Sequence, residues 1–240
     1  PPRSTLFPYT TLFRSAAKTS LENHFDRQFE LETELELKNK LALLGLARNT
    51  LPQGMKLVSV RQGKALGLGH AVACAAPVVQ DNPFAVLLPD VICYHAQQNA
   101  TAQLVTDFGQ HGVSSIALQA VDPAQVHKYG IAGVNELSQI NQLVEKPSAE
   151  QAPSNLAVLG RYLFTPAIFA ELEQTQRGVG GEIQLTDAMH ALLRHQPMRG
   201  VTFNGEVHDC GDKLGYLVAM LTFAQRHPEL GEAFKQLLKS

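Results

Sequence analysis

Cysteine, long apolar runs and blocks of like charge are all scarce in this sequence. Cys74, Cys93 and Cys210 are odd in number and share no metal-ligand or redox spacing, which predicts a reducing compartment, the cytoplasm. No apolar run approaches the roughly 20 residues of a membrane span, so no membrane partner is expected. The formal net charge of the 240 residues is −2, and without a basic patch no nucleic-acid partner is expected.

Several catalytic and metal-binding signatures are missing as well. The sequence has no Ser-His-Asp order, no His-Glu-x-x-His and no Cys-x-x-Cys. Proteolysis and structural zinc therefore receive little support.

The first twenty residues, PPRSTLFPYTTLFRSAAKTS, carry no strand or helix period. Residues 4–7 recur loosely as residues 10–13, each copy close to an arginine. Pro8 and its polar neighbours interrupt any apolar h-region, so a secretory signal is not indicated.

The rest of the chain alternates apolar strand-like runs with helical patterns, which predicts an α/β fold with a largely parallel, covered sheet. Strands are expected at 56–61, 84–88, 115–121, 140–145, 158–164 and near 201–203. Helices are expected after Gly69, after Thr165-Pro166, and at 98–111, 183–195, 211–226 and 228–239. Residues 29–46, with leucines at 31, 35, 41 and 44, predict one more helix, whose apolar face either covers the sheet or packs against another subunit.

A glycine-rich loop between a strand and a helix is the first stretch that could carry chemistry. In RQGKALGLGHA (61–71) glycines permit close approach of a ligand, and a helix N-terminus favours anions. The stretch matches neither a Walker loop nor the dinucleotide fingerprint, whose third glycine is replaced by Val72. By itself such a loop is also consistent with a purely structural turn.

Two aspartates stand at positions where a metal could be held. Asp90 follows a buried strand in LLPDV, at the edge where open α/β sheets bind ligands, and one carboxylate with phosphate oxygens is a usual Mg²⁺ site. Asp209 lies in VHDCGDK, before a helix start, and His208 beside it is interpreted as structural. Either aspartate could instead serve as a helix cap or turn residue.

Glu145 and Lys146 end a strand in VEKP. The carboxylate suits sugar hydroxyls and the ammonium suits phosphate, and Pro147 ends the strand so that both can reach a cleft. An ordinary exposed strand end is the alternative.

Taken together, these stretches resemble the bacterial UTP–glucose-1-phosphate uridylyltransferases. The resemblance runs from about Lys18 to the end through SLENHFD, VRQGKALGLGHAV, LLPDV, KYG, VEKP, APSNLAVLGRYLF, GEIQLTDA and HDCGDKLGY, in that order. It implies a doubly wound mixed sheet of the nucleotidyltransferase type (Rossmann-like). It also implies transfer of uridylyl from UTP to glucose 1-phosphate with release of pyrophosphate, Mg²⁺ as cofactor, and a homo-oligomer in the full-length parent.

On the nucleotide side the resemblance implies that Gln62 and Gly67 recognise uracil. Asp90 would hold Mg²⁺ with Asp209 as second ligand. Asp90 and Lys146 are thereby the expected catalytic residues.

On the sugar side the resemblance implies five residues. Gly130 would offer its main-chain N–H to the hexose, Glu145 would bind sugar hydroxyls and Lys146 the sugar phosphate. Asn155 and Gly160 would complete the pocket.

The sequence departs from the family in two places. Gly181 stands where the family usually has aspartate before Glu-Ile-Gln. The family's first strands, with their glycine-rich Gly-Thr-Arg loop, are not matched, so residues 1–15 are interpreted as a non-native adapter or vector segment, joined near 14–17 to a truncated nucleotidyltransferase domain at 16–240. We therefore expect an unpaired sheet edge, exposed apolar surface and impaired activity.

Three other functions are compatible with parts of the pattern. A non-catalytic regulatory sibling would tolerate Gly181, although the complete LLPDV, VEKP and HDCG phrases favour an enzyme. A glucose-1-phosphate thymidylyltransferase would use the same sugar phosphate. A structural α/β module without a site is the third alternative, and it would require every matched loop to be a chance resemblance.

Overall fold

The computed structural model describes residues 9–14 and 19–239, and the chain forms two compact units. The first unit comprises the chain up to residue 80 together with 176–184, and the second comprises 81–175 and 185–240. Among the described residues, no helix is both long enough and apolar enough to cross a bilayer. Each unit is described by itself.

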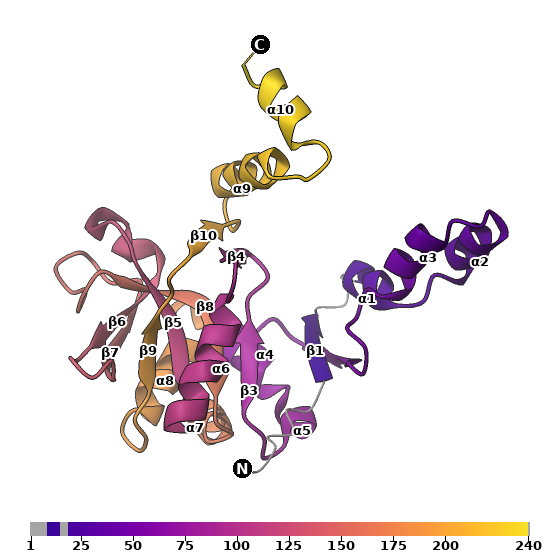
Figure 1. The fold of residues 1–240 in the computed structure, drawn as a ribbon. Coiled ribbons are helices and arrows are strands. Elements are labelled where there is room, and N and C mark those ends of the chain that lie inside the picture. The colour runs from indigo at the N-terminus through magenta and orange to yellow at the C-terminus, as the bar shows by residue number, and fades with distance from the viewer. Residues whose placement is uncertain (1–8, 15–18, 240) are drawn as a thin grey trace. The chain divides into compact units, whose positions relative to one another are not determined.

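A six-stranded mixed sheet forms the centre of the second unit (Figure 1). Its order is β7–β6–β8–β5–β9, and β3 pairs with the far half of β8. The strands are β3 (Phe84–Leu87), β5 (Ser115–Ala120), β6 (Gly130–Val134), β7 (Ile140–Glu145), β8 (Leu156–Phe164) and β9 (Arg199–Thr202).

The long strand β8 is central to this sheet because it pairs with two different strands along one of its edges. Its first half pairs with β6, its second half pairs with β3, and β5 runs along the other edge. Gly160, at the change of partner, has φ +63°, a conformation that glycine adopts without a Cβ penalty.

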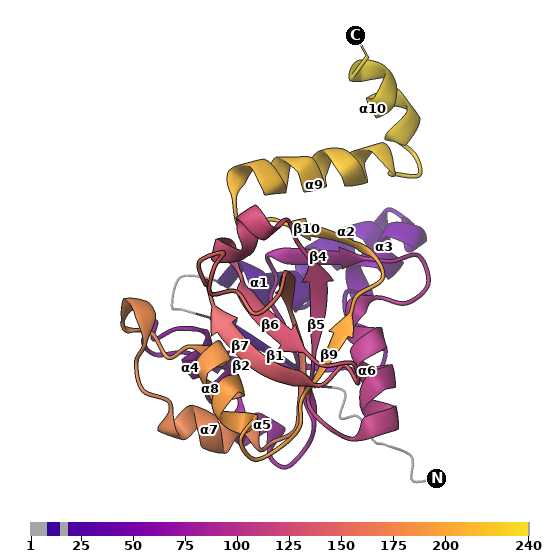
Figure 2. The same ribbon diagram turned by 90° about the vertical axis from the view of Figure 1, so that its left-hand side faces the viewer.

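Helices cover both faces of this sheet, as Figure 2 shows, with α6 (Ala100–His111) on one side and α7 (Ile168–Gln174) and α8 (Leu185–Leu192) on the other. Asn99 caps α6 by accepting a hydrogen bond from Ala102 N at 2.9 Å, and Gly112 ends it with φ +68°. Leu104 of α6 is fully buried against Leu159, Leu163 and other apolar residues of the strands. Burial on both faces explains the largely apolar sequences of β5 and β8.

A second, two-stranded sheet of this unit carries the C-terminal helices. β4 (Val91–Tyr94) pairs antiparallel with β10 (Glu206–Asp209), and α9 (Lys213–Gln225) and α10 (Gly231–Leu237) follow. The 3₁₀ helix η1 (Pro123–Lys128) precedes β6 and is capped by Asp122, whose carboxylate accepts from Ala124 N.

The first unit is built from short elements. β1 (Tyr9–Arg14) pairs parallel with β2 (Lys56–Arg61), and the helices are α1 (Thr19–Phe25), α2 (Phe29–Leu37), α3 (Leu41–Arg48), α4 (Leu68–Ala73) and α5 (Ala76–Val79), with the 3₁₀ helix η2 at Val179–Gly181. Glu32 is buried between two arginines, accepting from Arg27 Nε at 2.6 Å and from Arg48 Nε at 2.9 Å. This ion-pair cluster joins α2 to α3.

The structure corrects two expectations about the elements. Residues 29–46 are two helices, because the chain turns at Asn39 (φ +52°), and Leu31 and Leu41 are exposed, so the interpretation that this face covers the sheet is wrong for them. The six-stranded sheet is mostly antiparallel, with β5–β9 as its parallel pair, because short turns such as 135–139 cannot contain the crossover that parallel strands need. The strands β1, β4, β6 and β10 were not anticipated, and β1 at Tyr9–Arg14 lies in a stretch for which no strand period was found.

Candidate active site

Two aspartates from different strands meet in the second unit. Asp90 lies in the turn 88–91 that leads from β3 into β4, and Asp209 is the last residue of β10, opposite Val91 in the register. Cys210 N donates to Asp90 O at 2.7 Å, which fixes the two chain segments against each other. A methyl carbon built on Gly211 would lie 3.0 Å from Asp209 Oδ1 and 3.8 Å from Asp90 Oδ2, so both carboxylates border the same small space.

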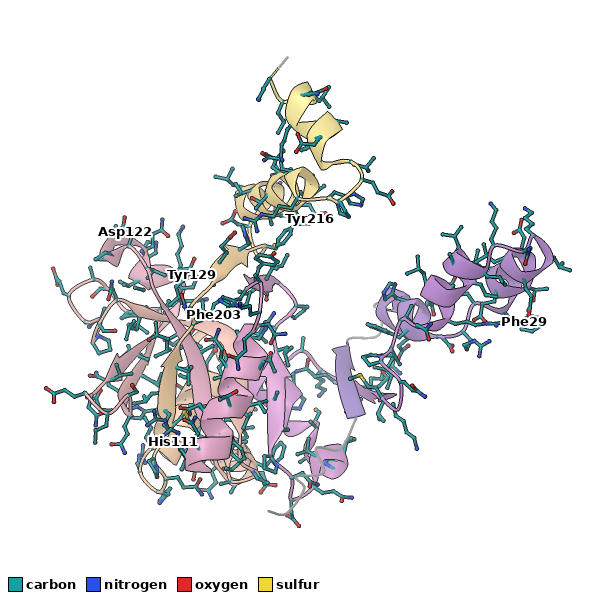
Figure 3. The ribbon with its side chains drawn as sticks, viewed as in Figure 1. Phe29, His111, Asp122, Tyr129, Phe203 and Tyr216 are labelled. Carbon is teal, nitrogen blue, oxygen red and sulfur yellow. The ribbon has the colours of Figure 1, made fainter. Side chains whose placement is uncertain are left out.

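The Asp209 carboxylate is held by two donors. Gly211 N donates to Oδ1 at 2.9 Å, and the Tyr129 hydroxyl donates to Oδ2 at 3.3 Å. Burial, followed by the negative charge of Asp209, raises the pKa of Tyr129, so its phenol keeps the proton that it donates. Figure 3 labels Tyr129, which follows η1.

This donor set fits a hard divalent cation with few protein ligands. Among the described residues no group of three or more His, Cys, Asp and Glu side chains could hold a metal. Mg²⁺ commonly takes only one or two carboxylates and completes its shell with water and substrate phosphates. Asp90, which is exposed, and Asp209 provide such a pair of carboxylates.

Glu145 lies in a second cluster, beside Gly130 and Thr186. The buried Thr186 hydroxyl, from α8, donates to Glu145 Oε2 at 2.7 Å. Gly130 pairs with Glu145 across β6 and β7, and a Cβ at position 130 would lie only 3.1 Å from that same oxygen. The glycine therefore leaves the carboxylate room, and the threonine fixes its orientation.

Lys146 has a strained backbone. Its φ is +46°, unusual for a residue with a long side chain, and its N–H donates to Tyr129 O at 3.0 Å. Left-handed non-glycine residues cost about 1–3 kcal/mol and cluster at functional sites. The strain turns the chain immediately after Glu145 and leaves the exposed Lys146 beside the residue whose hydroxyl contacts Asp209.

Tyr162 of β8 connects the two clusters electrostatically. Burial is the first cause that raises the pKa of this phenol, and the charges of Glu145 and Asp90 raise it further. Both carboxylates therefore lie within electrostatic reach of one buried hydroxyl. Of the residues expected in the site, the structure brings together Asp90, Asp209, Gly130, Glu145 and Lys146.

Gly160 and Asn155 occupy other surroundings. A Cβ on Gly160 would meet Leu88 at 2.9 Å, so this glycine permits close contact between β8 and the turn that carries Asp90. Asn155 Nδ2 donates to Val121 O at 3.1 Å, and Val121 N donates to Asn155 O. The asparagine thus ties the start of β8 to the end of β5.

Gln62 and Gly67 lie together in the first unit. Gln62 Nε2 lies 3.1 Å from Gly67 O and 3.0 Å from His70 Nδ1, so the loop closes on itself. Gly67 has φ +98°, and a Cβ there would lie 2.7 Å from Glu182 Cβ and 2.9 Å from Ile183 O. Only glycine fits this contact between the loop and residues 182–183.

Gly181, where the family's aspartate was expected, borders open space. It has φ +74°, and nothing lies within 4 Å of a Cβ built on it. An aspartate side chain would therefore fit, although its backbone would be strained.

Sequence reasoning did not assign a role in the site to Tyr129, Thr186 or Arg161. Tyr129 and Thr186 lie inside the phrases KYG and GEIQLTDA, which supply a signal for the segments and not for the individual side chains. A hollow of about 570 Å³ between α9 and α10 is lined by none of the expected site residues. The candidate site therefore rests on the residue clusters and their hydrogen bonds.

Two carboxylates at the carboxyl ends of strands, beside a lysine on a mixed, doubly wound sheet, are typical of an enzyme that handles phosphates. The family model described as nucleotidyl transferase matches residues 10–226. The chain belongs to the nucleotidyl transferase family.

Curated relatives and solved structures narrow this assignment to the UTP–glucose-1-phosphate uridylyltransferases within that family. The enzyme of that name from Haemophilus influenzae is 44% identical over 240 residues, covering 95% of this chain and 81% of the relative. The Escherichia coli K12 enzyme is 43% identical, covering 95% and 78%. The UTP-bound UGPase from Acinetobacter baumannii superposes with a TM-score of 0.88 at 40% identity, covering 97% of this chain and 82% of that one.

A UDP-glucose pyrophosphorylase complexed with UDP-glucose matches with a TM-score of 0.80 at 31% identity, covering 91% of this chain and 81% of that one. A putative glucose-1-phosphate thymidylyltransferase from Bacillus anthracis has a TM-score of 0.59 at 23% identity, covering 69% and 64%, and shares the fold. The doubly wound mixed sheet expected from the sequence is confirmed.

Proposed function

We propose that this chain is built to form UDP-glucose and pyrophosphate from UTP and glucose 1-phosphate. A phosphate oxygen of glucose 1-phosphate bonds to the α-phosphorus of UTP, the bond to the β-phosphate oxygen breaks, and pyrophosphate leaves. The observation that carries the proposal is the pairing of Asp90 with Asp209 in a chain 43–44% identical to uridylyltransferases.

On the sugar side, Thr186 donates to one oxygen of Glu145, which leaves the other oxygen to accept from hexose hydroxyls. Gly130 leaves space against this carboxylate for a ligand and offers its main-chain N–H. Lys146 follows directly and supplies an ammonium for the sugar phosphate. These residues would bind and orient the nucleophile, since alignment of the reacting groups provides much of the rate in such transfers.

On the metal side, Asp90 and Asp209 would hold Mg²⁺, with Tyr129 keeping its proton on the bond to Asp209. A bound Mg²⁺ supplies positive charge that offsets the repulsion between the anionic phosphates. Asp90 and Lys146 would be the two catalytic residues, because both would contact phosphate or its counterion.

On the nucleotide side, Gln62 and Gly67 would recognise uracil, through the loop that the Gln62 amide holds closed. Asn155 and Gly160 would act indirectly at the sugar pocket: Gly160 through the turn at Leu88, Asn155 through Val121. In this proposal the two residues shape the sugar pocket through their neighbours and need not touch the sugar themselves.

The nucleotide is tested by measuring pyrophosphate release from UTP or dTTP with glucose 1-phosphate and Mg²⁺. Because residues 1–15 are predicted to be foreign, the assay uses two proteins: the 240-residue chain, and a hybrid in which the Haemophilus influenzae relative's N-terminal segment replaces residues 1–15. We expect the hybrid to prefer UTP and the 240-residue chain to be slower by orders of magnitude. A preference for dTTP would favour a thymidylyltransferase, and an inactive hybrid that still binds UDP-glucose would favour a regulatory sibling.

We expect the chain to turn over more slowly than the hybrid because the hybrid would regain phosphate-binding donors. In other enzymes, removal of one hydrogen-bond donor to a transition-state oxyanion lowers the rate by about 100- to 1,000-fold. Equal turnover by the 240-residue chain and the hybrid would show that residues 1–15 need no replacement. The proposed junction at 14–17 falls largely on 15–17, outside the described residues.

We further propose a cytoplasmic location and a homo-oligomeric parent. The cysteines Cys74, Cys93 and Cys210 are all free, as suits a reducing compartment. Exposed leucines on α2, α3 and α9 provide apolar surface that a second copy could cover. Size-exclusion chromatography with light scattering on the hybrid tests the oligomer.

A further inference from the structure

Arg161 of β8 makes an unusual set of hydrogen bonds. Its Nη1 donates to Leu88 O at 2.6 Å and to Gly160 O at 3.2 Å, while its Nη2 donates to Val91 O at 2.5 Å. The guanidinium therefore spans the first and last residues of the turn 88–91. Asp90 is the third residue of that turn.

Three carbonyl oxygens take the place of a counterion for this partly buried cation. Among the described residues, no carboxylate lies within ion-pair distance of Arg161. Hydrogen bonds with a charged donor are stronger and more directional than those between neutral groups. Arg161 has no carboxylate partner and lies beside a proposed cation site. Its planar guanidinium therefore serves to position the backbone through hydrogen bonds.

Backbone hydrogen bonds also hold the turn 88–91 in place. Leu88 N donates to Gly160 O at 2.9 Å, and Cys210 N donates to Asp90 O at 2.7 Å, so β8 and the segment after β10 hold the turn from two sides. Gly160 permits this because a Cβ would meet Leu88. The guanidinium adds the bond to Val91, which neither backbone contact supplies.

We propose that Arg161 is a positioning residue that fixes the turn 88–91 and thereby orients Asp90 toward Asp209 and the divalent cation. The proposal rests on the proposed function, since it takes Asp90 to be a metal ligand. A lysine could not replace the arginine, because a single ammonium does not reach two ends of a turn as a planar fork does.

Binding of Mn²⁺ alone, followed by electron paramagnetic resonance on the full chain, tests this proposal apart from turnover. We expect Arg161→Met to weaken Mn²⁺ binding by about 10- to 100-fold, the usual effect of losing a ligand's supporting partner. Asp90→Asn, which replaces the proposed ligand itself, should weaken it at least as much. Arg161→Lys should weaken it nearly as much. Arg199→Lys is the matched control, because Arg199 of β9 bonds Asp107 and Leu137 O and not the turn, so it should leave Mn²⁺ binding unchanged.

Hydrogen exchange of the amides of Leu88 and Cys210 provides the second readout. Both amides should exchange faster in Arg161→Lys and keep the parent rate in Arg199→Lys. Parent-like Mn²⁺ affinity in a folded Arg161→Met, or in Arg161→Lys if the methionine variant does not fold, would overturn the proposal. If Asp90→Asn leaves Mn²⁺ binding unchanged, the metal assignment fails instead, and unchanged exchange in Arg161→Lys would separately refute the hold on the turn.

Discussion

The two units of this chain differ sharply in how much apolar surface they bury. Of the described apolar side chains that are buried, the first unit contributes Leu44, Val72 and Ala75, and the second unit contributes all the others. Phe29 on α2 projects from its helix and is 78% exposed (Figure 3). The second unit can therefore hold side chains rigidly through packing, whereas the first depends on hydrogen bonds between loops.

The residues proposed for function show the same difference within each unit. Asp209, Glu145 and Lys146 end strands of the second unit, and each is fixed by a partner from another element. Gln62 and Gly67 belong to one loop, closed by its own side chain and by residues 182–183. The proposed metal and sugar ligands are therefore positioned by a packed core, whereas the proposed uracil-binding residues are positioned by a few hydrogen bonds and backbone contacts.

The largest expected loss of stability comes from truncating a buried side chain of the second unit, which is the better packed one. Leu104→Ala removes a fully buried side chain and should lower the free energy of unfolding by about 2–5 kcal/mol. Leu44→Ala, in the first unit, should cost less, because few buried neighbours surround it. Thermal and urea unfolding of both variants measure the difference, and equal losses would contradict the contrast between the units.

Within the second unit, Thr186→Val should weaken sugar binding. The change removes the donor to Glu145 Oε2, a bond to a charged acceptor of the kind that contributes about 1.5–3 kcal/mol. In the active hybrid we expect KM for glucose 1-phosphate to rise about tenfold, with KM for UTP unchanged. Thr186→Ser retains the hydroxyl and serves as control; if serine behaves like valine, lost packing explains the effect instead.

In the first unit, Gly67→Ala should weaken UTP binding. The substitution forces alanine to φ +98° and into Glu182 and Ile183, a left-handed strain of about 1–2 kcal/mol before any clash. KM for UTP should therefore rise about tenfold. Gly63→Ala is the control, because nothing lies within 4 Å of its Cβ and its φ is not positive; a similar response from both variants would mean that the contact with 182–183 is unimportant.

The smallest effect concerns the ion-pair cluster of α2 and α3 and depends on pH. Hydrogen bonds from Arg27, then from Arg48, lower the pKa of Glu32 to about 2 from its ordinary 4.5. A lowered folded-state pKa stabilises above the unfolded value, so this contribution should be complete above pH 4.5 and fade as the pH falls toward 2. Glu32→Gln should lose less helical circular dichroism than the parent between pH 5 and about 2.5.

Glu30→Gln provides the matched control, since Glu30 is an exposed carboxylate in the first turn of the same helix. This variant should follow the parent across the acid range. If Glu32→Gln also follows the parent, the two arginines do not stabilise the α2–α3 pair through Glu32. High salt should reduce the difference, because Arg27 and Arg48 are exposed and screened.

An unpaired sheet edge was expected from the sequence, and the strand β3 is the candidate for it. Within the described part of the chain, β3 pairs with β8 and with no other strand, and its Leu87 is 53% exposed. Tyr216 of α9 is also exposed, on a helix whose leucines at 214, 217 and 221 are exposed. Such unpaired edges and apolar surfaces promote association between chains.

The sequence by itself determined the alternation of elements, most of their positions, and the family. Strands 56–61 and 140–145 were both predicted to the residue, since alternation marks the first and Pro147 follows shortly after the second. It also identified Asp90, Glu145, Lys146 and Asp209 as candidates, since charged residues at the ends of apolar runs are visible locally.

Only the tertiary structure decided which of these residues meet and what holds them. Tertiary structure sets the antiparallel path of β6, β7 and β8. It also makes the bond from Thr186 to Glu145, 41 positions apart, and the bond from Arg161 to Leu88, 73 positions apart. Hydrogen bonds and packing between such distant residues leave no periodic trace in the sequence, because each depends on where several strands bring the chain back together.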